Sequence, residues 1–283
     1  MNSKGKIKKS AIAFWNLRES SIILLTILLF IFVQCVNPAF LSKSNIVNMF
    51  RSTSYLLIAA CGMTFILISG NIDLSISTVM GLGGIVFCLL LKAGVPIFLS
   101  FIITMMIAVV IGFVNGYLIY EFNIPPMIMT LGMQYAAKGV INILTEGKPV
   151  YPLPEAFTKI DKITVLGMPF IAVVAIVIAI VCWFVIKKTR FGREVYAVGG
   201  NREASRLSGI NIRKTYIRVF IISACLAMFG GIAMAARVGS AQSASGTGYE
   251  LNSIVACLIG GTSVIGGSGG IAGTMIGSLF TQA

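Results

Sequence analysis

Long apolar stretches alternate with short polar segments along the chain, and this pattern predicts a bundle of membrane-spanning helices. A helix needs about 20 apolar residues to cross the hydrocarbon core of a bilayer. Seven stretches come near that length, and two shorter ones, interrupted by glycine, follow them. In order, they are Ser21–Val36, Ser54–Ser69, Ser75–Leu91, Val95–Tyr120, Met127–Leu144, Val165–Ile186, Tyr216–Ala236, Leu251–Ile265 and Ile271–Phe280. We therefore expect an all-α, polytopic transmembrane helical bundle with some broken or short helices, forming a single domain over residues 1–283.

The longest strongly polar segment, Lys187–Arg218, lies between the sixth and seventh apolar stretches. It holds nine basic residues and only two acidic ones, Glu194 and Glu203. Because loops rich in Lys and Arg stay on the cytoplasmic side of a membrane, we place the loop 187–215 in the cytoplasm. The N-terminal tail, residues 1–20, holds five basic residues and belongs on the same side, six crossings earlier. The outer segments then hold six basic residues, which is the expected asymmetry.

A short capped helix is predicted inside this loop, between Asn201 and Gly209. Asn201 is a suitable N-cap, and Glu203 falls in the first turn, where the helix dipole favours a negative charge. Gly209 can adopt the left-handed conformation that ends a helix. Such a short helix is unstable alone in water, so either the membrane domain or a soluble partner must pack on it.

The pattern Glu203-Ala204-Ser205-x-x-x-Gly209 resembles the EAA-x-x-x-G loop of ABC importer permeases, with Ser205 in place of the second Ala. The longer string TRFGREVYAVGGNREASRLSGI is similar to the monosaccharide branch of these permeases, the ribose, xylose and autoinducer-2 type. In that superfamily the loop forms a coupling helix that sits in a cleft of the ATP-binding subunit. The resemblance implies coupling residues, namely Arg193, Gly200, Asn201, Glu203, Ala204 and Gly209. The alternative is a plain positive-inside loop with an incidental cap.

A second polar feature, Gly70–Thr78, interrupts the apolar pattern with almost no loop. Asp73 or Ser75 can cap the next helix, or a broken helix can expose these groups to a translocation path. The segment NIDLSIS resembles GIDLSVG of sugar permeases, with Asn71 in place of a glycine. Asn115, a polar residue inside the fourth stretch, is the third candidate for the path, beside Asp73 and Ser75.

Glycines recur at four-residue spacing, at Gly112 and Gly116 and again at Gly269, Gly273 and Gly277. Small residues at this spacing let helix backbones approach closely in lipid, so we expect packing faces there.

The small, polar segment between Arg237 and Glu250 is expected outside, within reach of a soluble partner. From Ala236 to Phe280 the chain is similar to the C-terminal half of sugar permeases. Family members usually continue for several tens of residues, so we expect a C-terminus shortened relative to the family.

Composition narrows the possible chemistry. Of 283 residues, 57% are hydrophobic and 11% charged, about half the charged fraction of a soluble domain. The net charge of +13 fits lipid headgroups better than nucleic acid. The sequence has no His, no CxxC pair, no acidic cluster for a metal and no Walker A motif. We expect no cofactor or metal, no catalytic residues, and ATP hydrolysis in another subunit.

The resemblance implies a permease subunit of an ABC importer for a monosaccharide, in the bacterial plasma membrane. The asymmetry of basic residues predicts a cytoplasmic N-terminus. The expected partners are an ATP-binding subunit, an extracytoplasmic sugar-binding protein, a second permease copy or close relative, and membrane lipid. A secondary carrier for a small neutral polar solute is the alternative, although few acidic relays lie within the membrane. A membrane-embedded enzyme is disfavoured, since no catalytic set of side chains is available.

Overall fold

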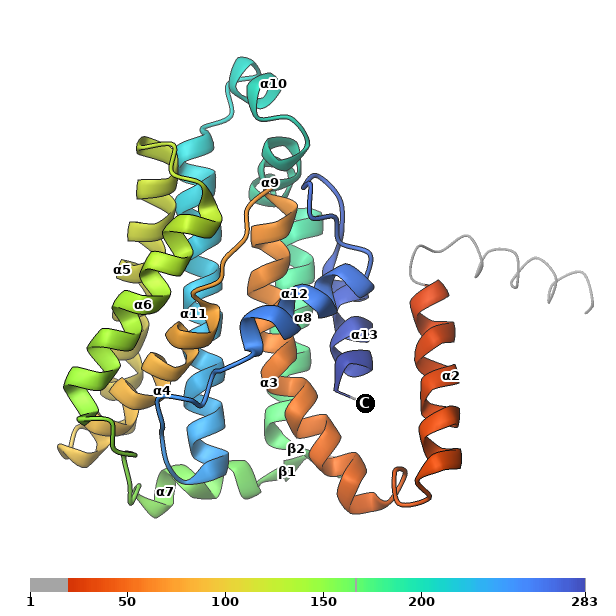
Figure 1. Ribbon diagram of the computed structural model, residues 1–283, viewed down its shortest axis with the longest axis vertical. Coiled ribbons are helices and arrows are strands. Elements are labelled where there is room, and N and C mark those ends of the chain that lie inside the picture. The colour runs from red at the N-terminus through yellow and green to blue at the C-terminus, as the bar shows by residue number, and fades with distance from the viewer. Residues whose placement is uncertain (1–19, 166, 283) are drawn as a thin grey trace, which may run out of the picture.

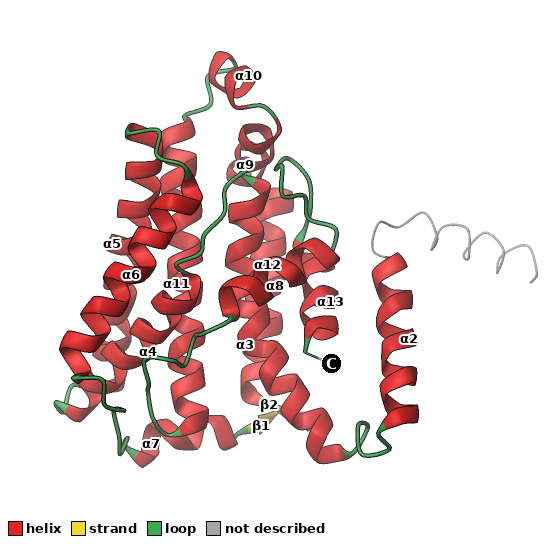
Figure 2. Ribbon diagram, viewed as in Figure 1, coloured by secondary structure: helices red, strands yellow, loops and turns green. Residues whose placement is uncertain are grey.

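The computed structural model describes residues 20–165 and 167–282, which are almost entirely helical (Figures 1 and 2). The longer helices are α2 (Ser20–Val36), α3 (Lys43–Ile68), α4 (Ile76–Lys92), α5 (Ile97–Glu121), α6 (Pro126–Thr145), α8 (Phe170–Lys188) and α11 (Ile212–Val238). The shorter elements are α7 (Glu155–Thr158), η1 (Lys159–Lys162), α9 (Arg190–Gly200), α10 (Arg202–Leu207), α12 (Tyr249–Ile259), α13 (Ile271–Thr281) and a hairpin of β1 (Thr164–Val165) and β2 (Met168–Pro169). The basic residues of the tail lie outside the described residues.

Each of the nine apolar stretches predicted from the sequence forms a helix, which confirms the all-α bundle. Among the described residues, α3, α5, α8 and α11 are long and apolar enough to cross a membrane. By contrast, α4 has 17 residues, and α12 and α13 have 11 each. The expected short helices are therefore present. Helix α3 starts at Lys43, well before the apolar stretch, because Ser42 caps a polar first turn.

The helices stand roughly side by side between two ends of the molecule (Figure 1). We call the end that carries α9 and α10 the α10 end, and the opposite end, with α7 and the hairpin, the α7 end. Helices α3, α5 and α8 run toward the α10 end, and α6 and α11 run back. Helix α2 lies at the edge of the bundle, in contact with α13, and runs toward the α7 end (Figure 1). With this alternation, α2 begins on the same side as the loop after α8, as the parity of six crossings requires.

Helix α3 forms the centre of the core. Its residues from Thr53 to Ile68 are all buried, in contact with α8, α11, α12 and α13. Helix α11 packs on α3, α4 and α5. The outward faces of α2, α5, α6 and α8 carry large apolar side chains, as expected of surfaces that face lipid.

Glycines allow the closest helix contacts, as the spacing predicted. A Cβ on Gly112 of α5 would overlap the backbone of Ile221 in α11, and one on Gly116 would lie 2.6 Å from the Cα of Ile217. Gly273 and Gly277 bring α13 against α12 in the same way. Gly269 does not belong to that helical face, because it lies in the loop before α13.

Substitution of Gly112 by Ala tests this packing. The added methyl group has no space between α5 and α11, so we expect a loss of about 1–3 kcal/mol in stability and a lower midpoint of thermal unfolding in detergent. Gly132→Ala on α6 is the matched control, because its Cβ meets nothing within 4 Å. Equal midpoints for the two variants would contradict the close contact.

Candidate functional site

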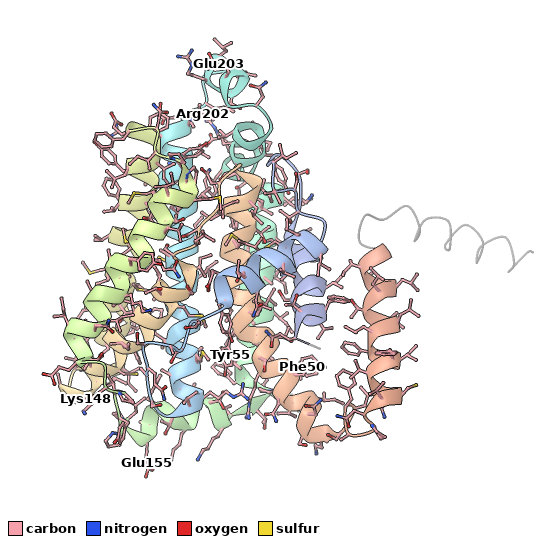
Figure 3. The ribbon with its side chains drawn as sticks, in the orientation of Figure 1. Phe50, Tyr55, Lys148, Glu155, Arg202 and Glu203 are labelled. Carbon is pink, nitrogen blue, oxygen red and sulfur yellow. The ribbon has the colours of Figure 1, made fainter. Side chains whose placement is uncertain are left out.

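The predicted capped helix is present as α10, at the tip of the α10 end (Figure 3). The side chain of Asn201 accepts a hydrogen bond from the backbone N–H of Ala204 at 2.8 Å. Gly209 has φ +78°, the left-handed conformation expected after the helix. A side chain at Gly209 would be strained by this φ, which explains why glycine suits the position.

Helix α10 projects outward and leaves most of its surface uncovered. Ser205 is its one buried residue, whereas the apolar side chain of Leu207 is 79% exposed. Arg206 donates a hydrogen bond to Glu203 at 2.6 Å. This bond and the positive charge of Arg206 lower the pKa of Glu203, so its carboxylate is ionised at neutral pH. Glu203, Arg206 and Leu207 therefore lie on the uncovered surface of α10.

Arg202 fixes the base of α10 to the ends of α5 and α11. Its guanidinium lies over the rings of Tyr120 and Tyr216, at 5.5 and 5.7 Å from their centroids, and donates to Asn123 at 3.3 Å. Cation–π contacts of this kind orient a guanidinium as well as attract it. Arg202 therefore connects α10 with both α5 and α11.

Helix α9 lies within the segment predicted as a polar loop. It packs between α8 and α10. Phe191, Val195 and Val198 face the protein, and Thr189 caps the helix through a bond from the N–H of Gly192. Arg193 lies exposed on its outer face. A hollow of about 380 Å³ separates α9 from the start of α11, and most of its charged side chains are basic. Its lining residues are Arg190, Phe191, Glu194, Gly209, Asn211, Lys214 and Arg218.

Three backbone segments meet below α9, in a contact that we call the glycine junction: Gly199–Gly200, Ile68–Gly70 and Gly266–Gly267. The N–H of Gly267 donates to the carbonyl of Ile68 at 2.9 Å. A Cβ on Gly199 would overlap that same carbonyl, and one on Gly266 would lie 2.8 Å from the Cα of Gly70. The last turn of α9, just before α10, thus touches the end of α3 directly. A Cβ on Gly200, in contrast, meets nothing within 4 Å.

After Gly70 at the glycine junction, the chain enters a buried polar cluster that contains Asp73 and Ser75. The carboxylate of Asp73 accepts hydrogen bonds from the N–H of Ser75 at 2.9 Å, from its hydroxyl at 2.6 Å and from the hydroxyl of Ser223 at 3.1 Å. Asn115 donates to the Ser75 hydroxyl at 3.4 Å. The three residues predicted for the path are therefore adjacent, although they come from different parts of the chain. Ser223, from α11, was missed; its polar side chain directly after the apolar run Val219–Ile222 was the available signal.

This cluster is closed in the structure. Asp73 is 2% exposed, and Ser75, Asn115 and Ser223 are each 1% exposed. Ser75 is the N-cap residue of α4, but its side chain makes no cap hydrogen bond, so Ser75 does not cap the helix as the sequence suggested. Asp73 instead holds the backbone just before α4, through the N–H of Ser75. The side-chain oxygen of Asn115 is buried with no hydrogen-bond partner among the described residues. Exposure of this cluster to a path requires that the helices around it separate.

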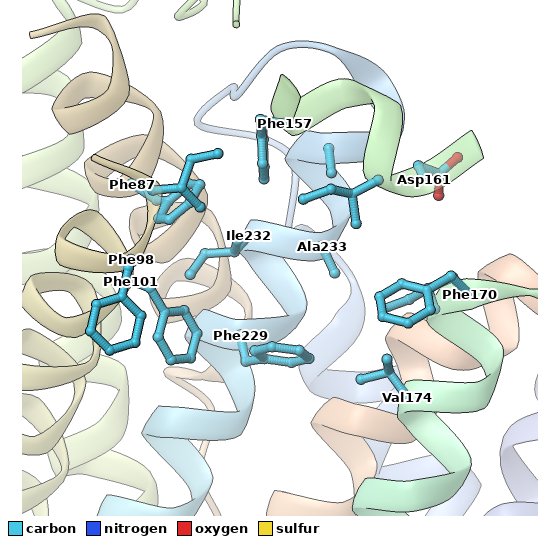
Figure 4. A pocket seen from close by; sticks show the side chains of 14 residues that line it. Phe87, Phe98, Phe101, Phe157, Asp161, Phe170, Val174, Phe229, Ile232 and Ala233 are labelled. Atoms are coloured by element: carbon cyan, nitrogen blue, oxygen red, sulfur yellow. The ribbon is translucent and has the colours of Figure 1, made fainter. Parts of the chain in front are cut away.

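A separate cavity of about 440 Å³ lies near the α7 end, between α5, α8 and α11 (Figure 4). Phenylalanine side chains form much of its wall, including Phe87, Phe98 and Phe229. Asp161, the one charged residue in the wall, is engaged by Arg51 and by the hydroxyl of Tyr55. The wall therefore has no free group for a polar solute, and its chemistry suits hydrocarbon.

Substitution of Asp73 separates the two interpretations of the polar cluster. Asp73→Ala leaves the Ser75 and Ser223 donors without their acceptor, so we expect a loss of about 1–3 kcal/mol and a lower unfolding midpoint in detergent. Asp73→Asn keeps an acceptor oxygen and is expected to be milder. A normal midpoint for Asp73→Ala together with lost transport would instead indicate that Asp73 acts on the solute.

Comparison with known proteins agrees with this architecture. A family model described as the permease component of a branched-chain amino acid transport system matches residues 45–283. The ribose import permease RbsC of Haemophilus influenzae is 35% identical over 98% of this chain and 87% of its own length. RbsC of Escherichia coli K12 is 35% identical over 94% of this chain and 84% of its own.

The autoinducer 2 import system permease LsrC of Salmonella typhi is 31% identical over 94% of this chain and 76% of its own length. No solved structure matches the chain. The family model spans the helices from α3 onward, including α10 and the polar cluster. The chain therefore belongs to this family of transport permeases and is a multi-pass membrane protein.

Proposed function

We propose that the chain is the membrane subunit of an ATP-driven importer for a monosaccharide, with α10 as its coupling helix. The observation that carries this proposal is the surface of α10: a well-capped helix that presents Glu203 and Leu207 outward, uncovered by any other described part of the chain. The relatives named as ribose and autoinducer-2 import permeases support a sugar-like solute.

The proposed orientation puts the α10 end, and with it the tail 1–20 and the loop 187–215, in the cytoplasm of a bacterium. The basic residues of that loop support this orientation, because positive charge is retained on the inner side. The α7 end then lies outside, together with the segment between Arg237 and Glu250. There a sugar-binding protein would deliver the solute.

In this proposal, a separate subunit hydrolyses ATP, since the sequence has no Walker A motif. Its closure pushes on α10 through the coupling residues Arg193, Gly200, Asn201, Glu203, Ala204 and Gly209. The displacement passes through α9 to the glycine junction. From there it reaches the segment 69–75 and the start of α4.

The polar cluster of Asp73, Ser75 and Asn115 is the proposed gate of the path. The hydrogen bonds within this buried cluster support a resting state in which the path is closed. Separation of α4 from α5 and α11 would open the path. A second permease copy, or a close relative, would enclose the path from the other side, because one chain leaves α6 exposed along its length. Membrane lipid covers the remaining apolar faces.

Reversal of charge at Glu203 tests the coupling role. Glu203→Arg removes the ion pair with Arg206 and places two positive charges side by side on α10, so we expect weaker binding of the ATP-binding subunit. Co-purification of that subunit and ATP-dependent uptake of D-ribose should both fall by about tenfold or more, the effect of 1.4 kcal/mol. Glu155→Arg makes the same change of charge at the α7 end and should leave co-purification intact (Figure 3).

A secondary carrier remains the alternative. Reconstitution of the purified chain alone in vesicles distinguishes the two functions. An importer subunit does not accumulate sugar without its ATPase, whereas a carrier does so when an ion gradient is applied. Normal co-purification and uptake with Glu203→Arg would also contradict the proposed coupling.

A further inference from the structure

A small polar cavity of about 150 Å³ lies between α4, α6 and the segment that leads into α12. Every side chain in its wall carries a hydrogen-bonding group. The lining residues are Ser77, Thr78, Gln134, Tyr135, Lys138, Ser243, Thr247 and Glu250. Ser77, on the first turn of α4, lies two residues after Ser75 of the polar cluster. The cavity therefore adjoins the proposed gate.

Two opposite charges line the cavity without neutralising each other. Glu250 lies in the first turn of α12, and its Oε2 atom is buried with no hydrogen-bond partner in the described chain. Lys138 lies on α6, seven residues or ~10 Å before the end of the helix at Thr145. No ion pair links Lys138 and Glu250, or joins either one to another described residue. Lys138 is exposed on α6, so its ammonium group is accessible to a solute in the cavity.

No described residue supplies the missing partner of Glu250. A buried acceptor without a donor costs free energy, which a bound group that donates a hydrogen bond would recover. Lysine only donates, and a carboxylate only accepts, whereas a hydroxyl group does both. Several hydroxyl groups on one small solute can satisfy Lys138, Glu250 and the surrounding Ser, Thr and Gln together.

The wall also excludes an apolar side chain. The family model is described for branched-chain amino acid transport, yet the cavity has no aliphatic residue in its wall against which a leucine side chain could pack. Its volume is below the 300–1,000 Å³ typical of sites for drug-sized ligands, which suits a small solute.

We propose that this cavity is a binding site in which the permease itself holds a neutral polyhydroxylated solute, with Lys138 donating to its hydroxyl groups and Glu250 accepting from them. The proposal deepens the importer function, on which it rests for the direction of transport. It places part of the discrimination between a sugar and a branched-chain amino acid in the permease, beside that of the binding protein.

Thiol labelling of the complete transporter in vesicles tests occupancy of the cavity. Thr247→Cys, in a background with Cys35 and Cys225 replaced by Ala, puts a thiol in the wall, and Lys148→Cys is an exposed control outside it. We expect D-ribose or D-xylose at millimolar concentration to slow maleimide labelling of Thr247→Cys several-fold, with no effect of leucine and none on Lys148→Cys. Equal protection by leucine, or none by either sugar, would overturn the proposal.

Uptake of D-ribose by Glu250→Gln provides the second measurement. Loss of the charged acceptor should lower the rate by about tenfold while the ATPase still co-purifies, and Glu146→Gln, outside the cavity, should match the unmodified protein. Unchanged uptake in Glu250→Gln would count against the site. The two proposals can be contradicted independently. If sugar protects Thr247→Cys from labelling but uptake needs no ATP, the binding site is supported and the importer function is contradicted. If uptake depends on ATP but sugar gives no protection, the importer function is supported and the binding site is contradicted.

Discussion

The contact of three backbones at the glycine junction is the constraint on which the rest of the structure depends. Gly199 lies against the carbonyl of Ile68 because glycine has no side chain, and any Cβ at this position would overlap that carbonyl. Such a contact between backbones transmits displacement with little loss, since packed protein interiors resist compression. It joins α9, which leads into the proposed coupling helix α10, to the end of α3, from which the chain runs into the Asp73 cluster.

The junction and the polar cluster together explain why α4 is short. The chain ends α3 near the α10 end, turns at Gly70 and runs back into the bundle before Ser75 starts the next helix. A break of this kind leaves backbone groups without helical partners, which is tolerated in a membrane protein only inside the protein or beside a polar path. Asp73 supplies the missing acceptor in the closed state. The adjoining cavity, lined by Ser77, Lys138 and Glu250, provides polar groups on the other side of the same break.

Much of this fold was predictable because its determinants are local. Hydropathy predicted the nine apolar stretches that contain helices. The residue types within one short segment predicted the cap at Asn201 and the left-handed conformation of Gly209. Helix α9 was missed because it is polar overall and ends in two glycines, although Phe191, Val195 and Val198 do repeat at helical spacing. The early start of α3 at Lys43 was not predicted for a related reason: the first turns of this helix are polar, so the helix begins before the apolar pattern does.

The parts that escaped prediction depend on contacts between distant segments. Asp73 and Ser223 are 150 residues apart, and the contact of Gly199 with Ile68 spans a similar distance in sequence. No periodicity within one element specifies which of many glycines or serines will meet in the folded chain. The family resemblance pointed to the loop and to the polar segment, yet it did not indicate that the two are in direct contact.

Transport by Gly199→Ala, compared with Gly230→Ala, tests this mechanical link most directly. Both changes add one methyl group to a helix, but only the first overlaps the end of α3, whereas a Cβ on Gly230 of α11 lies 3.4 Å or more from its neighbours. We expect Gly199→Ala to bind the ATP-binding subunit and hydrolyse ATP while sugar uptake is lost, and Gly230→Ala to transport normally. Wild-type uptake by a stably folded Gly199→Ala, or loss of ATPase binding together with uptake, would contradict the account.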